Sequence, residues 1–227
     1  MRRSPRYVAS SRSMALLGLA VLTLVSSRRA AGQEPKSAEL DSATVAAIAP
    51  IVQQARTANL PLELLYAKAR EGQVQRAPVA RIEAAVRALA ARLQAANDAL
   101  APNATAQELG AAADALKAGV PGETLREMRR TGRDGSLAVP IGVLTQLVLR
   151  GVPVEKASVQ VVDLLQRGAM ANHFIALDER VRADVLAGKR PDESLDLRLK
   201  GIIPNLPQQA PSNGDAIQAT TTPRRPR

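Results

Sequence analysis

Residues 78–101 read PVARIEAAVRALAARLQAANDALA and decide the class of fold. Apolar side chains recur here at alternating spacings of three and four residues, the period of one face of an α-helix. They are Val79, Ile82, Val86, Leu89, Leu93, Ala96 and Leu100. Glu83 and Arg87 lie four residues apart and can pair on the outer face. This row of apolar residues covers only about three heptads, which is too short to require a long coiled coil. It predicts a helix that packs on a neighbouring helix at a crossing angle of about +20°.

A Pro-x-Glu element recurs four times, near residues 59, 119, 151 and 189. The copies read NLPLE, GVPGE, GVPVE and KRPDE. Proline presets φ for a first helical turn, and the glutamate faces the positive end of the helix dipole, so each copy predicts a helix start. The spacings of 60, 32 and 38 residues are uneven, which indicates a degenerate repeat. A glycine near the end of each copy is expected to end its helix in the left-handed conformation; these are Gly72, Gly132, Gly168 and Gly201.

Other helix signals fill the sequence between these copies. Thr105 and Glu108 form a capping box for a helix that stops at Gly119. Residues 140–150 are apolar nearly all round, which predicts a buried helix. Residues 172–187 are amphipathic and precede a terminating glycine.

The segment 42–58 is helical in composition, but Pro50 is expected to break or kink it. No segment alternates with the period of a strand between turn residues. The chain is therefore predicted to be all-α, with eight or nine helices in short antiparallel hairpins. These hairpins form either a degenerate helical-repeat, solenoid-like array or an irregular bundle. A single domain is expected over residues 41–203, after a loose segment at 33–40.

The two ends of the chain differ from this pattern. Residues 1–32 contain six Arg, no acidic residue and a 12-residue apolar run at 14–25, which indicates an export signal. Cleavage is expected near Gly32, with Ser27 as second choice, and would leave a periplasmic or secreted protein. A short uncleaved anchor and a misassigned start are the alternatives. Residues 204–227, rich in Pro, Gln and Thr, are expected to be disordered.

Composition excludes several kinds of function. The chain of 227 residues has no Cys and one His, so disulfides, thiolate metal sites and multi-histidine sites are absent. The net charge of +10 comes mainly from the two ends of the chain. Residues 33–227 contain 25 basic and 21 acidic residues, and three of these basic residues are Arg224, Arg225 and Arg227. With only Tyr66 and Phe174 as aromatic residues after the leader, nucleic-acid binding is not expected. No cofactor, metal ion or transmembrane span of the mature chain is expected either.

Few side chains suggest a site. His173 would need an orienting carboxylate and a nucleophile to act as a base, and Asp178 lies about 140° away round the helix. A surface histidine is the simpler interpretation. Basic residues that could meet an anionic partner are Arg126, Arg129, Arg130 and Arg133, although a solvated face is the default interpretation. The acidic groups near residues 178–184 and 192–196 are interleaved with Lys and Arg, which favours salt bridges over metal binding.

Three functions remain open. The preferred hypothesis is an exported, non-enzymatic helical scaffold or interaction module of the cell envelope, which binds another envelope protein or a peptide. The first alternative is a helical carrier of a small apolar ligand, which an alanine-rich interior could hold. The remote alternative is a cell-wall hydrolase that uses carboxylates alone.

Overall fold

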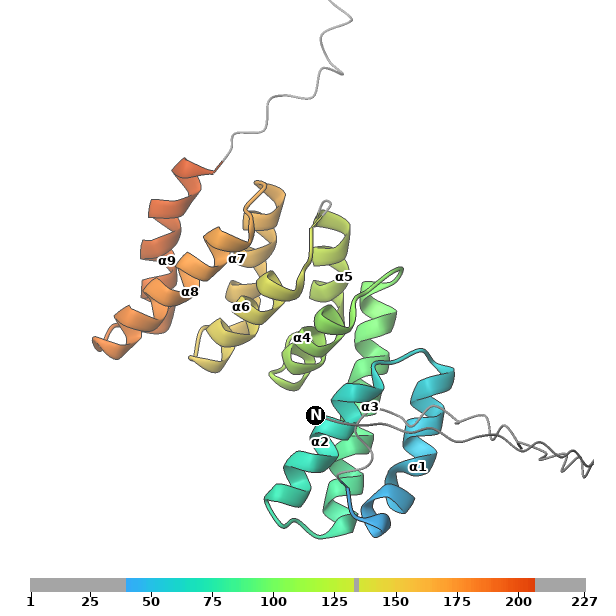
Figure 1. Cartoon of the computed structure of the whole chain (residues 1–227). Helices are drawn as coiled ribbons and strands as arrows, with labels where there is room; N and C mark the ends of the chain where they lie inside the picture. The colour runs from blue at the N-terminus through green and yellow to red at the C-terminus, as the bar shows by residue number, and fades with distance from the viewer. Residues whose placement is uncertain (1–39, 133–134, 207–227) are drawn as a thin grey trace, which may run out of the picture. The chain divides into compact units, whose positions relative to one another are not determined.

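A computed structural model of the chain describes residues 40–132 and 135–206, and all of them are helical or lie in short connections between helices. This part of the chain forms nine α-helices and no strand, which confirms the all-α prediction (Figure 1). The predicted leader, most of the 33–40 segment and residues 207–227 of the predicted tail lie outside the described residues. The helices are α1 (Ser42–Thr57), α2 (Leu62–Val74), α3 (Val79–Leu100), α4 (Ala106–Lys117), α5 (Gly122–Thr131), α6 (Ala138–Leu149), α7 (Val154–Gln166), α8 (Ala171–Leu186) and α9 (Pro191–Ile202).

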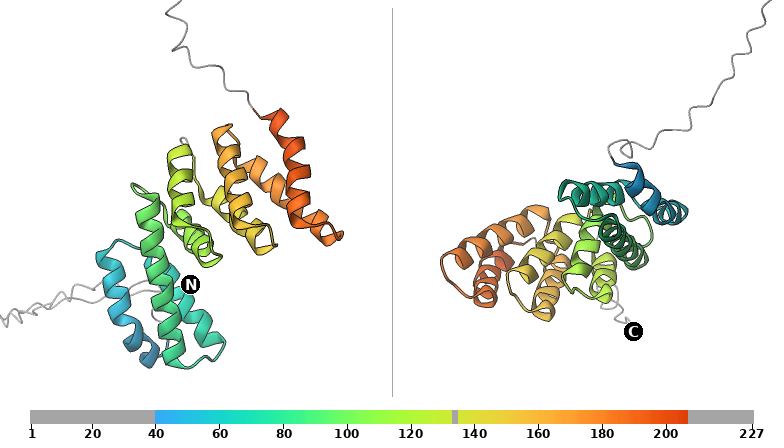
Figure 2. Two further views of the ribbon diagram at one scale, coloured as in Figure 1. Left: turned by 180° about the vertical axis from the view of Figure 1, so that it is seen from behind. Right: turned by 90° about the horizontal axis from the view of Figure 1, so that it is seen from below.

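The helices from α4 onward stack as successive hairpins. Helix α6 packs between α4 and α8, so the first helices of three hairpins form one row. The second helices α5 and α7 also pack side by side (Figures 1 and 2). The arrangement is that of a short helical-repeat array, in which each hairpin buries its apolar face against the next one.

Helix α3 joins this array to the first hairpin. It contacts α1 and α2 on one side and α4 and α5 on the other. The heptad positions Ile82, Val86, Leu93 and Leu100 are buried, whereas Val79 and Leu89 are half-buried. The predicted Glu83–Arg87 ion pair is present on its outer face. The apolar stripe of this 22-residue helix is therefore long enough to pack against several neighbouring helices.

The repeated element in the sequence is a helix-to-helix connection. Leu60, Val120 and Val152 are buried and donate their backbone N–H to carbonyls five residues earlier, at 2.9, 3.0 and 3.1 Å. The residues before them, Asn59, Gly119 and Gly151, have φ of +54°, +95° and +97°. This is the Schellman arrangement, in which a left-handed residue closes one helix and an apolar residue covers its end. The proline that follows stands at the N-cap of the next helix in these three copies.

Of the four glycines predicted to end a helix in the left-handed conformation, only Gly168 does so, with φ of +78°. Gly72 lies inside α2, and a Cβ there would come within 2.8 Å of Ile82 Cγ1, so this glycine allows α2 to approach α3. Gly132 ends α5 with φ of −65° and makes room for Leu137, while Gly201 lies inside α9. Close packing, which the local sequence does not report, explains Gly72 and Gly132.

Two further expectations were wrong: a break at Pro50 and an end of the ordered fold at residue 203. Pro50 does not break α1, which runs through it from Ser42 to Thr57. Both Pro50 and Ala46, whose carbonyl loses its usual donor, are exposed, so water can satisfy that oxygen. The described fold also continues past residue 203, because a 3-10 turn, η2 (Ile203–Asn205), places Leu206 against the core.

Helix α6 is the most deeply buried, as its composition predicted, with seven of its twelve residues enclosed. No helix in the described ranges is long and apolar enough to cross a membrane.

Candidate functional site

The predicted arginine cluster does not form one surface. Arg126 is exposed and pairs with Glu123 on α5 itself. Arg129 turns inward and approaches Glu108 of α4, Nη2 to Oε1, at 3.2 Å. Arg130 is exposed, and Arg133 lies outside the described residues. Arg126 and Arg129 therefore pair with different carboxylates, one on α5 and one on α4.

His173 serves the first turn of its own helix. Its Nδ1 accepts a hydrogen bond from the backbone N–H of Met170 at 3.0 Å, which satisfies a donor at the start of α8. Asp178 pairs instead with Arg150, the residue directly after α6. The structure thus places no orienting carboxylate from α8 beside the imidazole. The His173 ring instead stabilises the start of α8 by accepting the Met170 N–H.

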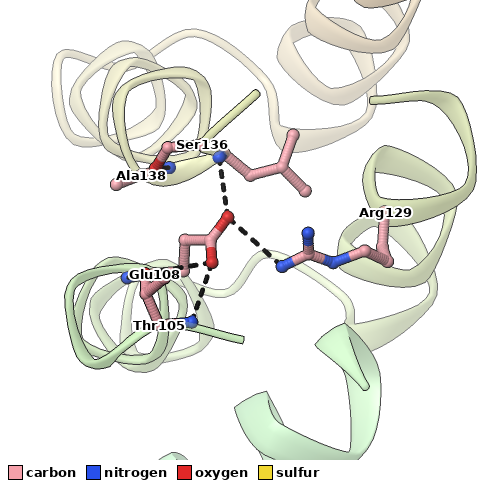
Figure 3. Close-up of polar contacts among 6 residues, drawn as sticks. Thr105, Glu108, Arg129, Ser136 and Ala138 are labelled. Atoms are coloured by element: carbon pink, nitrogen blue, oxygen red, sulfur yellow. Dashed lines mark hydrogen bonds and ion pairs between the residues drawn. The ribbon is translucent and has the colours of Figure 1, made fainter. Parts of the chain in front are cut away.

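Glu108 is the centre of the most buried polar cluster around α5 (Figure 3). Its Oε2 accepts hydrogen bonds from the backbone N–H and hydroxyl of Thr105, at 2.9 and 3.0 Å, and so completes the predicted capping box. Its Oε1 accepts the backbone N–H of Leu137 at 2.8 Å and faces Arg129. One carboxylate therefore caps α4, caps the entry to α6 and neutralises a charge on α5.

The surroundings of Glu108 favour its ionised form. Burial alone raises the pKa of this carboxyl, but the hydrogen bonds from Leu137 and Thr105, together with the charge of Arg129, outweigh burial, and the pKa falls below 4.5. The Nε and Nη2 atoms of Arg129 are buried and make no hydrogen bond within the described residues. The pair is therefore held by charge more than by directed bonds.

A second buried carboxylate, Asp184, joins α8 to α9. It accepts two hydrogen bonds from Arg198, both at 2.7 Å, one from Lys189 at 2.9 Å and one from the Ser194 hydroxyl at 2.8 Å. These donors, Arg198 first, hold its pKa well below its usual range. Among the described residues, no group of three His, Asp or Glu side chains could hold a metal ion. Of the acidic residues that the sequence grouped on α8 and α9, all but Glu179 make salt bridges within the described part of the chain.

The surface feature that best resembles a binding site is a groove of about 430 Å³ between α5 and α7. We call it the α5–α7 groove. It is lined by Pro121, Thr124, Glu127, Val154, Glu155, Ser158, Val159, Val162, Asp163 and Gln166. Val159 is 62% exposed and supplies apolar surface to the groove. The groove is thus an apolar strip with carboxylates along it.

The charge of this groove has one sign. Its lining contains three carboxylates and no basic side chain. Asp163 pairs with Arg167 at 2.7 Å, whereas Glu127 and Glu155 are exposed and have no ion-pair partner within the described residues. Ser158 is buried, and its Oγ has no hydrogen-bond partner in the same part of the chain. The groove is therefore suited to an occupant that carries positive charge and hydrogen-bond donors.

Two other grooves on the described surface lack this character. One, of about 380 Å³ between α1 and α3, is lined by four alanines and by Arg87. The other, of about 440 Å³, lies between the α5–α6 and α7–α8 connections and has no charged side chain among its described lining residues. Negative charge therefore sets the α5–α7 groove apart from both.

Sequence reasoning missed this groove because its two walls are separate in the chain. The repeat contained the available signal: Pro121 and Glu155 belong to two copies of the Pro-x-Glu element. Stacking of these copies brings the starts of α5 and α7 together, which a single helix start does not reveal.

Comparison of the chain with protein-family models, curated proteins and solved structures finds no match to any of the three.

Proposed function

We propose that the protein is a non-enzymatic helical interaction module that works after export, in the cell envelope or outside the cell. The observation that carries the proposal is the α5–α7 groove, an apolar strip with unpaired Glu127 and Glu155 on the surface of stacked hairpins. Stacked helical hairpins commonly present such elongated surfaces to peptides and partner proteins. The export step rests on the leader pattern in residues 1–32.

The buried carboxylates give little support to hydrolytic chemistry. A carboxylate-only hydrolase needs one acid whose pKa is raised. The pKa values of Glu108 and Asp184 are instead both lowered by their donors. Both groups connect helices, which is the role of structural carboxylates in an interaction module.

Site-specific cross-linking in cells tests the proposal. A photoreactive residue replaces Val159 in the groove of the full-length chain, and a matched chain carries it at Arg182, which is exposed on α8. We expect cleavage of the leader and one heavier adduct from position 159, which weakens with Glu155→Lys and is absent from position 182. An uncleaved cytoplasmic chain contradicts the export step. Equal adducts from both positions, or none, contradict the interaction module.

A second candidate function, carriage of a small apolar ligand, is favoured by the groove between α1 and α3. Its walls include Ala55, Ala58, Ala90 and Ala91, whose small side chains leave room for an occupant. Native mass spectrometry of the purified chain tests for a co-purifying ligand. We expect Ala90→Leu, which fills the groove, to remove that ligand; a ligand-free wild-type chain with no thermal shift across a lipid panel refutes this candidate.

A further inference from the structure

We infer that the α5–α7 groove binds residues 223–227 of the same chain, whose sequence is PRRPR. The inference rests on the proposed function in one respect: the groove is the surface that a partner would use. The segment would then act as an internal competitor that a partner must displace.

Charge complementarity is the first argument. Arg224, Arg225 and Arg227 supply three of the four charged side chains in residues 207–227, and Asp215 is the fourth. The groove presents Glu127 and Glu155 without an ion-pair partner in the described residues, and its lining has no basic residue. Opposite charges of this density attract over about 8 Å at physiological salt. The other two grooves lack this match, since one contains Arg87 and the other has no charged side chain in its described lining.

The shape and chemistry of the groove are the second argument. Val154, Val159 and Val162 form an apolar strip on which proline rings and arginine stems can lie. Guanidinium groups offer five N–H donors each, and Glu127, Glu155 and the unpartnered Ser158 hydroxyl are acceptors. A Pro-Arg segment therefore meets both the apolar and the polar parts of the groove.

The length of the chain permits the contact. Seventeen residues lead from Leu206, the last described residue, to Pro223, and a fully extended segment of that length spans at most about 55 Å. Helix α9 packs on α8, α8 on α6, and α6 on α7. Three helix-to-helix steps of about 8–10 Å each cover roughly 30 Å, well within that reach.

Attachment to the same chain lets a weak contact persist. A tethered segment experiences an effective concentration on the order of millimolar, so a low intrinsic affinity suffices for occupancy. Exposed ion pairs are individually weak, and neutralising one carboxylate is expected to reduce affinity about two- to fivefold. The contact should therefore be reversible and should weaken as salt rises.

Competition by a labelled peptide tests the inference. The probe is a fluorescent peptide of residues 217–227, IQATTTPRRPR, and binding is measured by anisotropy. The receptors are the full-length chain and the same chain with Arg224→Gln, Arg225→Gln and Arg227→Gln, which frees the groove. We expect the substituted chain to bind the probe about fivefold or more tightly than the unsubstituted chain, because its own segment no longer competes.

Matched charge variants locate the site. In the arginine-substituted chain, Glu127→Gln with Glu155→Gln should weaken probe binding about fivefold or more. The control is Asp114→Asn with Glu179→Gln, which removes two exposed carboxylates on α4 and α8, away from the groove, and should leave binding unchanged. Equal affinity of the two receptors for the probe overturns the inference, as does no probe binding or equal weakening by both charge variants. Thermal unfolding of each variant verifies that it is folded.

The outcomes remain distinct from those of the cellular experiment. If a partner cross-links from position 159 but the probe fails to bind, the internal contact is wrong and the interaction module stands. If the probe competes as expected but cells yield no partner adduct, the internal contact stands and the proposed function fails.

Discussion

Replacement of Glu108 is the sharpest test of how the hairpins are held together. Glu108→Ala removes the acceptor of the buried Leu137 N–H, and an unsatisfied donor of that kind costs about 1–3 kcal/mol. It also leaves Arg129, which is 23% exposed, without its counter-ion, at about 1 kcal/mol after screening. Loss of one buried methylene adds about 0.8 kcal/mol. We expect a total destabilisation of about 3–5 kcal/mol.

Glu108→Gln separates these contributions. The glutamine keeps the methylenes and one acceptor, but its amide NH₂ must then face either the Leu137 or the Thr105 donors. We expect a loss of about 1–3 kcal/mol, intermediate between wild type and alanine. The control Glu179→Ala, at an exposed position on α8, should change stability by less than about 0.5 kcal/mol.

Urea unfolding and hydrogen exchange provide the assay. Protection of the Leu137 amide should fall in Glu108→Ala, because that N–H loses its buried acceptor. If Glu108→Ala stays within about 0.5 kcal/mol of wild type, or Leu137 keeps its protection, the carboxylate does not connect α4 to α6 as described.

The remaining predictions concern pH, glycine and the core. Because the pKa of Asp184 is lowered from 3.8, its stabilising effect is complete above pH 3.8 and is lost as pH falls through the folded-state pKa. Asp184→Asn should therefore lower the Tm at pH 7 and flatten the acid limb of a pH series; an unchanged limb contradicts this. Gly119→Ala, at φ of +95°, should cost about 1–2 kcal/mol, whereas Gly142→Ala inside α6, where an added Cβ meets no atom within 4 Å, should stabilise by about 0.5–1 kcal/mol. Similar effects of the two in thermal melts refute the assignment of the left-handed turn. Leu144→Ala in buried α6 should cost about 2–5 kcal/mol, against less than about 0.5 kcal/mol for Leu149→Ala, which is 65% exposed; chemical denaturation that gives them equal costs contradicts the burial of this helix.

The candidate site was only partly accessible to sequence reasoning. The capping-box role of Glu108 is readable from Thr105 three residues earlier, since both partners belong to one helical turn. Its bond to Leu137 crosses 29 residues, and its contact with Arg129 depends on how α5 packs on the array. Arg126, Arg129 and Arg130 read as one basic face, yet the fold turns only Arg129 inward.

The sequence by itself determined the helical class, the approximate limits of most helices and the capping box of α4. These depend on short-range rules: the 3.6-residue period, the proline and glycine preferences of helix ends, and contacts within one turn. It also determined the uneven Pro-x-Glu repeat, because each copy is a local connection between two helices.

Only the tertiary structure decided which helices become neighbours. The packing role of Gly72 depends on Ile82 of another helix, and the α5–α7 groove exists because two repeat copies stack side by side. The physical reason is that burial of apolar surface is non-directional, so periodicity shows which face of a helix is covered but not what covers it. That choice emerges from the joint packing of all the helices, and it placed two unpaired glutamates beside an exposed valine.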